Sequence, residues 1–137
     1  LTMGQQQLLL IVLGVIIVGI AIVVGINLFN ANAEESTKDS IVTQGTNIGA
    51  MAQQYYKKPT ALGGGGNNFA GFKTNVFDKL PANLRTSTDA TWACAVTDGA
   101  AGNVVLTATP NDAGYATRWT VETRVTKDSL SSQVKVK

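Results

Sequence analysis

The most constraining feature of this chain is its opening segment, because the first 33 residues contain no ionisable side chain. Residues 8–26 read LLLIVLGVIIVGIAIVVGI, an apolar run interrupted only by glycine. About 20 helical residues rising roughly 1.5 Å each span the ~30 Å hydrocarbon core of a bilayer. A secretory signal peptide has a basic n-region and an apolar core of only about 7–15 residues, so we expect this segment to be retained. The first residue is Leu1 rather than Met, so we expect a processed product.

Composition limits the remaining ~100 residues to one modest globular domain. The net charge is +2, and the longest basic run is the pair Lys57 and Lys58, so nothing indicates nucleic-acid binding. The single cysteine, Cys94, rules out an intrachain disulfide and a cysteine zinc cluster. Histidine is absent, which removes the commonest general base and transition-metal ligand. We therefore expect no enzymatic activity, no cofactor and no metal.

An amphipathic pattern resumes after the polar stretch EESTKDS at residues 34–40. Its apolar and small residues follow a helical spacing: Ile41, Gly45, Ile48, Ala52 and Tyr55. Lys57 and Lys58 suit a helix C-terminus, and Pro59 disfavours helix at the residue before it. The sequence predicts one long helix over residues 1–57, with a membrane or filament-core segment at 1–28 and an amphipathic segment at 29–57. Its weakest point is EESTKDS, where we expect a kink or a melted turn.

Residues 58–88 are predicted to form a loop and a connector. Four consecutive glycines, Gly63 to Gly66, predict a plain flexible linker, because the strand, helix and Lys-Ser/Thr of a phosphate-binding loop are missing. Residues 69–84 contain aromatic and aliphatic side chains at irregular helical spacing, which predicts a short helix or turn that packs on a core and stops at Pro81.

Residues 89–137 show a period of two, which is typical of half-buried strands. The predicted inward positions are Ala90, Trp92, Cys94 and Val96; Val104, Leu106 and Ala108; Tyr115, Thr117, Trp119, Val121, Thr123 and Val125; Leu130, Val134 and Val136. The connectors DGAAGN and PNDAG suit hairpins. The predicted class is α+β: a long N-terminal helix whose amphipathic half packs on a small antiparallel sheet of three to four strands.

Three further groups of residues have a structural and a functional interpretation. Oxygen ligands for calcium could come from Asp98, Asn103, Asn111 and Asp112, but they match no ordered ligand spacing, so turn chemistry is preferred. A catalytic acid/base pair would have to come from Asp98, Asp112, Glu122 and Asp128. Turns or strand faces separate these residues, so the sequence brings no two of them together. Phe29, Tyr55 and Tyr56 are too sparse for a stacked conductive path, so helix packing is preferred. Cys94 is expected to be a small buried hydrophobe.

An apolar N-terminal helix that continues into an amphipathic half, followed by a Gly-rich loop and an antiparallel sheet, resembles the type IV pilin superfamily. Leu1 corresponds to the mature N-terminus of that family, Thr2 to a frequent second residue, and Gly14 to a common glycine. The chain departs from the pattern at Gln5, where the family usually has Glu, and at Ile22, where it often has a helix-kinking proline. The C-terminal disulfide of many pilins is also impossible here.

The resemblance implies cleavage by a prepilin peptidase, possible N-methylation of Leu1, and use of a pilus assembly machinery. It implies a subunit held in the inner or cytoplasmic membrane that then polymerises with itself into an extracellular filament used, for example, in cell adhesion. A major pilin is the leading expectation. A secretion pseudopilin and a single-pass membrane-anchored extracytoplasmic binding domain are the alternatives.

The residues that we expect to serve assembly lie in the first half of the helix. Unpaired amides are costly in an apolar environment, so Gln5, Gln6 and Gln7 are expected to form interhelical hydrogen bonds or, alternatively, to lie at the membrane interface. Gln5 would accept a hydrogen bond from a neighbour's N-terminal amine without contributing a charge. The helix glycines Gly14, Gly19 and Gly25 are candidates for flexibility or close packing. The four-residue pairs Ala21/Gly25 and Gly45/Gly49 are candidates for subunit contact or local flexibility.

Overall fold

The computed structural model describes residues 2–137, and Leu1 lies outside the described residues. Helix α1 runs without interruption over Thr2–Lys57, which confirms the predicted long helix and its C-terminal end. The EESTKDS stretch is helical throughout, so the kink or melted turn expected there is absent from the described chain. Two compact units divide the molecule: an apolar unit that ends at Ser36, and a head of residues 37–137 that contains the second half of α1.

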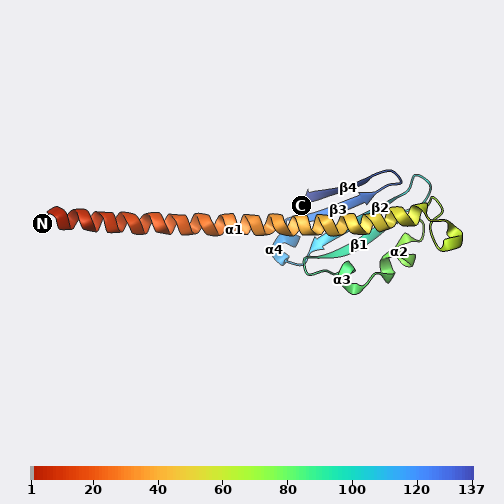
Figure 1. The fold of residues 1–137 in the computed structure, drawn as a ribbon, viewed down its shortest axis with the longest axis horizontal. Coiled ribbons are helices and arrows are strands. Elements are labelled where there is room, and N and C mark those ends of the chain that lie inside the picture. The colour runs from red at the N-terminus through yellow and green to blue at the C-terminus, as the bar shows by residue number, and fades with distance from the viewer. Residues whose placement is uncertain (1) are drawn as a thin grey trace. The chain divides into compact units, whose positions relative to one another are not determined.

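The head contains a four-stranded antiparallel sheet (Figure 1). The strands are β1 (Ala90–Thr97), β2 (Asn103–Pro110), β3 (Trp119–Val125) and β4 (Leu130–Val136). Their spatial order, β1-β2-β3-β4, is their order in the sequence, because each connection is short enough for an antiparallel neighbour. The α+β class is therefore confirmed. The connectors contain η1 (Thr60–Leu62), α2 (Phe72–Asn75), η2 (Phe77–Lys79), α3 (Ala82–Arg85) and α4 (Ala113–Ala116).

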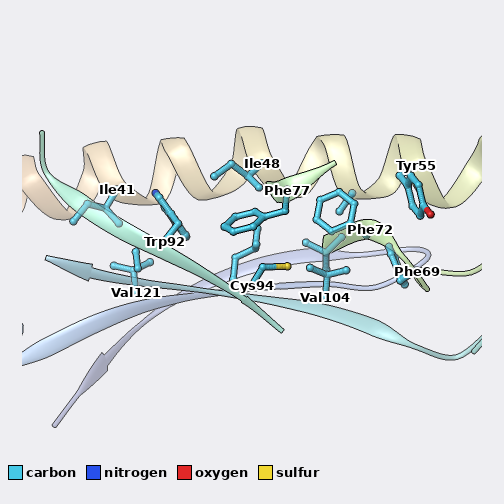
Figure 2. Close-up of a cluster of buried hydrophobic side chains, with 14 of the residues drawn as sticks. Ile41, Ile48, Tyr55, Phe69, Phe72, Phe77, Trp92, Cys94, Val104 and Val121 are labelled. Atoms are coloured by element: carbon cyan, nitrogen blue, oxygen red, sulfur yellow. The ribbon is translucent and has the colours of Figure 1, made fainter. Parts of the chain in front are cut away.

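The core lies between the second half of α1 and one face of the sheet (Figure 2). The helix contributes Ile41, Ile48 and Tyr55 at the predicted seven-residue spacing, and all three are buried. The sheet contributes the inward positions of β1, β2 and β3, including Trp92, whose indole N–H donates to Gln44 Oε1 at 3.4 Å. The amphipathic half of the helix thus covers the apolar face of the sheet, as the sequence predicted.

Two glycines in α1 allow the helix to approach the sheet closely. A Cβ atom at Gly45 would lie 2.6 Å from a ring carbon of Trp92, and one at Gly49 would lie 2.5 Å from Leu130 Cδ1. Both residues are buried inside the head. The Gly45/Gly49 pair therefore serves contact within the chain, which corrects both sequence interpretations, subunit contact and local flexibility.

The Gly-rich segment folds back on the end of α1, so its interpretation as a plain flexible linker is wrong. The last carbonyl groups of a helix lack partners within the helix. Here Gly65 N–H donates to Tyr55 O at 2.8 Å, and Asn67 N–H donates to Tyr56 O at 2.7 Å. A Cβ atom at Gly65 would overlap the carbonyl oxygen of Asn68, so this position requires glycine. The segment therefore closes the C-terminal end of the helix.

The connector between the loop and the sheet adds aromatic side chains to the core. Phe69, Phe72 and Phe77 are buried, as predicted, and Tyr55 packs edge-on against Phe72 with a centroid distance of 5.7 Å. The chain turns at Pro81, but a short helix, α3, begins directly after it, an element that the sequence did not predict.

The third strand begins later than predicted. Alternation from Tyr115 predicted a strand over 115–125, whereas residues Ala113–Ala116 form α4 and the strand begins at Trp119. The reason is a helix cap: Asp112 Oδ1 accepts hydrogen bonds from the N–H groups of Gly114 at 2.8 Å and Tyr115 at 3.3 Å. The inward positions from Trp119 onward are buried, as predicted.

The fourth strand has the predicted face but not the predicted burial. Val134 lies opposite Val121, and Val136 lies opposite Trp119, so both valines are on the core side of the sheet. Val134 is nevertheless 39% exposed and Val136 is 84% exposed. Strand β4 is an edge strand, and among the described residues nothing buries the end of its inner face.

Candidate functional site

The apolar first half of α1 is the most unusual surface of the protein. Every large apolar side chain from Met3 to Phe29 is exposed, from 52% at Leu13 to 74% at Met3. By length and composition, this is the one helix of the described chain that could cross a membrane. Eighteen side chains are involved, and full burial of each contributes roughly 1.5–3 kcal/mol, so covering the segment yields tens of kcal/mol.

The segment is apolar on all sides, not along a single stripe. Successive helical residues are rotated by about 100°, so the consecutive residues Leu8 to Leu13 cover the full circumference. A helix that is hydrophobic all round requires an apolar environment on every side. A lipid bilayer and a bundle of similar helices both provide this, whereas packing on one face of a globular domain does not.

The glycines of this segment differ from those in the head. A Cβ atom at Gly14, Gly19 or Gly25 would have no neighbour within 4 Å. These residues leave small hollows along a helix that is otherwise covered by large side chains. Such hollows allow another helix to approach closely, so the packing interpretation of these three residues, and of the Ala21/Gly25 pair, stays a prediction.

The three glutamines lie in the first turns of α1, and all are exposed. Residues one and two positions apart do not share a helix face, so Gln5, Gln6 and Gln7 point in three different directions. Gln6 lines a shallow groove together with Leu9, Leu10 and Leu13. The polar groups are thus arranged around the helix, where each could reach a different neighbour. The expected roles of Leu1 as a processed N-terminus and possible methylation site fall on a residue outside the described part.

The acidic and amide groups of the head do not gather into a metal site among the described residues. Asp98 and Asn103 flank the turn between β1 and β2, whereas Asn111 and Asp112 follow the other end of β2. The eight-residue strand β2 separates the two loops, so the four oxygen-bearing side chains do not come together. Asp112 caps α4, and Asn111 Nδ2 donates to Ser87 O at 2.7 Å.

The carboxylate of Glu122 lies in a hollow on the outer face of β3 and β4. Lys135 Nζ contacts one of its oxygens closely, and Arg124 lies 3.7 Å from the other. Asp128 pairs with Lys127 at the next turn, 3.8 Å away. These carboxylates are engaged by cations at separate places, and they form no acid/base pair with Asp98 or Asp112.

Cys94 is buried beneath the connector, which confirms its interpretation as a small hydrophobe. Burial raises the pKa of its thiol from the ordinary 9.0 to about 11, while nearby Lys73 acts weakly in the opposite direction. A thiol with a raised pKa is protonated at neutral pH and reacts slowly.

A stack of aromatic and cationic side chains at one end of the head was missed by the sequence interpretation. Tyr115 and Trp119 stack with a centroid distance of 5.8 Å, Lys38 Nζ lies 5.4 Å from the Trp119 ring, and Arg118 lies 5.4 Å from the Tyr115 ring. The stack joins α1, α4 and β3, so no local pattern in the sequence reveals it. It fixes the start of β3 against the helix.

Comparisons of the chain with protein-family models, with curated proteins and with solved structures find no match. The class of protein is therefore defined by its own features. It is an α+β protein with a long apolar N-terminal helix on a small antiparallel sheet, consistent in shape with a pilin-like fold.

Proposed function

We propose that this protein is a structural subunit, a major pilin, that polymerises through the apolar half of α1 into an extracellular filament. The observation that supports this most strongly is that every large side chain of a segment that is apolar on all sides is more than half exposed. A compact head already has its own core, so the segment is not needed for folding of the head. It is available for contact with other copies of the chain.

In this proposal the same segment is covered in two different environments, the membrane and the filament. Before assembly, it lies in the inner or cytoplasmic membrane and anchors the subunit there. In the filament, it packs against the corresponding segments of other copies. The segment can leave the lipid because the helix bundle covers the same apolar surface. Keeping that surface out of water contributes ~25 cal/mol per Å². Cleavage by a peptidase and methylation of Leu1 are part of this proposal, as are an assembly machinery and a role in adhesion.

Gln5 takes the place of an acidic docking residue. In the bundle its amide accepts a hydrogen bond from a neighbour's N-terminal amine, and Gln6 and Gln7 bond to helices on other sides. A neutral amide costs less to bury than a carboxylate, but it also binds a cation less strongly. We expect Gln5→Leu to reduce filament yield several-fold, because it removes the acceptor but keeps the apolar surface. Normal yield from this variant would overturn the docking role of Gln5.

The filament itself is tested by shearing cells that produce the protein and examining the released material by electron microscopy. We expect thin filaments that contain this chain as their main component. Retention of all the protein in the membrane fraction under conditions of full expression would overturn the proposal. A variant with Gly63→Asn provides a control, because this loop position has a left-handed backbone that Asn tolerates and open space around it.

The main alternative is a single-pass membrane-anchored domain, because the apolar segment also suits a bilayer. This alternative gives a monomer that detergent extracts from membranes and that shear does not release. The encoded residues before Leu1 also discriminate: a short basic leader that ends in Gly or Ala favours the pilin.

A further inference from the structure

The charges of the sheet are divided between its two halves. Residues 86–117, which contain β1 and β2, include three acidic residues and no basic residue. Residues 118–137, which contain β3 and β4, include five basic and two acidic residues. The basic residues are Arg118, Arg124, Lys127, Lys135 and Lys137. The formal charge is therefore −3 in one half and +3 in the other.

The fold turns this division of the sequence into a division in space. Because the strand order is the sequence order, the acidic half includes the β1 edge and the basic half ends at the β4 edge (Figure 1). The β1–β2 turn, which contains Asp98, and the β3–β4 turn, which contains Lys127, lie at the same end of the sheet. Asp89, Asp112 and Lys137 lie at the opposite end of the sheet.

The groups at these positions are accessible to a partner. Asp98 and Lys127 are exposed, and Lys127 has a surface ion pair with Asp128 in which both side chains are more than half exposed. Such a pair contributes little to folding. Strand β4 also exposes Val134 and Val136 on its inner face, so the basic edge has an uncovered apolar part. The connector beside β1 is not acidic, because it carries Lys73, Lys79 and Arg85 against Asp78, so the acidic character belongs to β1, β2 and their turns alone.

We propose that the basic β3–β4 edge of one copy of this protein docks against the acidic β1–β2 half of a second copy. This inference rests on the proposed filament and specifies how its heads associate. The connector flanks part of β1, but the β1–β2 turn lies at the end of the sheet, so a sideways displacement of the second copy brings Lys127 of one copy towards Asp98 of the next. Opposite potentials steer such partners together and fix their register. The contact joins two different surfaces, and such a heterologous contact extends a helical polymer when its rotation does not close a ring.

A charge-swap experiment on the full chain tests this contact. Lys127→Glu and Asp98→Lys each place like charges opposite each other in the proposed contact, and we expect either variant to lower the sheared filament yield about fivefold. The double variant restores opposite charges with reversed polarity, so its yield should return to nearly that of the unmodified chain. High salt should lower the yield of the unmodified chain in reassembly from detergent, since exposed charges are screened.

Matched controls separate a docking role from a general effect of charge. Asp39→Lys, on the exposed side of α1, makes the same change in net charge as Asp98→Lys, and Lys58→Glu makes the same change as Lys127→Glu, but both lie outside the sheet and away from the connector beside β1. We expect both controls to assemble normally. Normal filaments from both sheet variants, or no rescue in the double variant, would overturn the docking contact and leave the proposed function standing. Absence of filaments from the unmodified chain would overturn the proposed function itself.

Discussion

The two halves of α1 have the same backbone but opposite surroundings. In the second half, glycine and small residues bring the helix against the sheet, and Ile41 and Ile48 are almost fully buried. In the first half, residues of the same type, such as Ile16 and Ile17, are more than half exposed. The comparison shows that the folding of the head uses only one half of the helix. The other half keeps its apolar surface for an environment outside the chain.

A lysine introduced into each half of α1 is expected to give the largest difference in filament yield. Val18→Lys places a charge in the exposed apolar half, where an apolar surrounding imposes a cost of about 2.5–3.5 kcal/mol, so we expect filament yield to fall by about 60- to 300-fold. Ala50→Lys places the same charge on the exposed side of the head half and should leave most of the yield intact. Quantitative immunoblotting of sheared fractions measures both. Equal yields would remove the distinction between the halves.

Substitution of a glycine in each half gives the next largest effect. Gly45→Val forces side-chain atoms into Trp92 and Thr123, and we expect the free energy of unfolding of the head to fall by about 3 kcal/mol. Gly19→Val makes the same chemical change where no atom lies within 4 Å, and the stability of the head should stay within about 0.5 kcal/mol. Denaturant unfolding in detergent, followed by tryptophan fluorescence, reports on the head. A stable Gly45→Val head would contradict the close approach of helix and sheet.

The closure of the C-terminal end of α1 is tested by a substitution in the Gly-rich segment. Gly65→Ala should destabilise the head by about 2 kcal/mol, because a methyl group would overlap the Asn68 carbonyl and the hydrogen bond to Tyr55 O would be lost. Hydrogen exchange at the amides of residues 64–67 should become faster in this variant. Rapid exchange at these amides in the unmodified protein would instead support a flexible linker.

The pH dependence of the head gives the smallest effect. The pKa of the Cys94 thiol is raised to about 11, whereas in the unfolded chain it is 9.0. Between these two values the unfolded chain has lost a proton that the folded head keeps, so the free energy of unfolding should fall as the pH rises from 9 to 11. Comparison with Cys94→Ala isolates this contribution from those of lysine and tyrosine. Identical pH profiles would show that the thiol is hydrated in the folded protein.

The sequence predicted the features that depend on local periodicity. The spacing of Ile41, Ile48 and Tyr55 indicated the buried helix face, and the period of two indicated most inward positions of β1 to β3. Features that depend on distant contacts could not be predicted. The Asp112 cap stops an alternating pattern that would otherwise suit a strand, and the exposure of Val136 follows from the position of β4 at the edge of the sheet.

The candidate site was partly predictable for the same reason. The apolar run and the glutamines are local features, so the sequence located them directly. The Gly45/Gly49 pair has the same four-residue spacing as the Ala21/Gly25 pair of the first half, but only the sheet residues next to Gly45 and Gly49 show that they serve the core of the head. The stacking of Trp119 with Tyr115 and the charge division of the sheet likewise depend on the topology of the head.

Photo-crosslinking from the apolar half tests the central claim most directly. A photoreactive phenylalanine derivative in place of Leu10 lies in the groove beside Gln6 and should report on whatever covers this surface. In the sheared fraction, we expect irradiation to produce a ladder of covalent dimers and higher multimers of this chain, because other copies surround the segment. Adducts with lipid alone, with no multimer of the chain in any fraction, would contradict the claim that the exposed half of α1 is a polymerisation element.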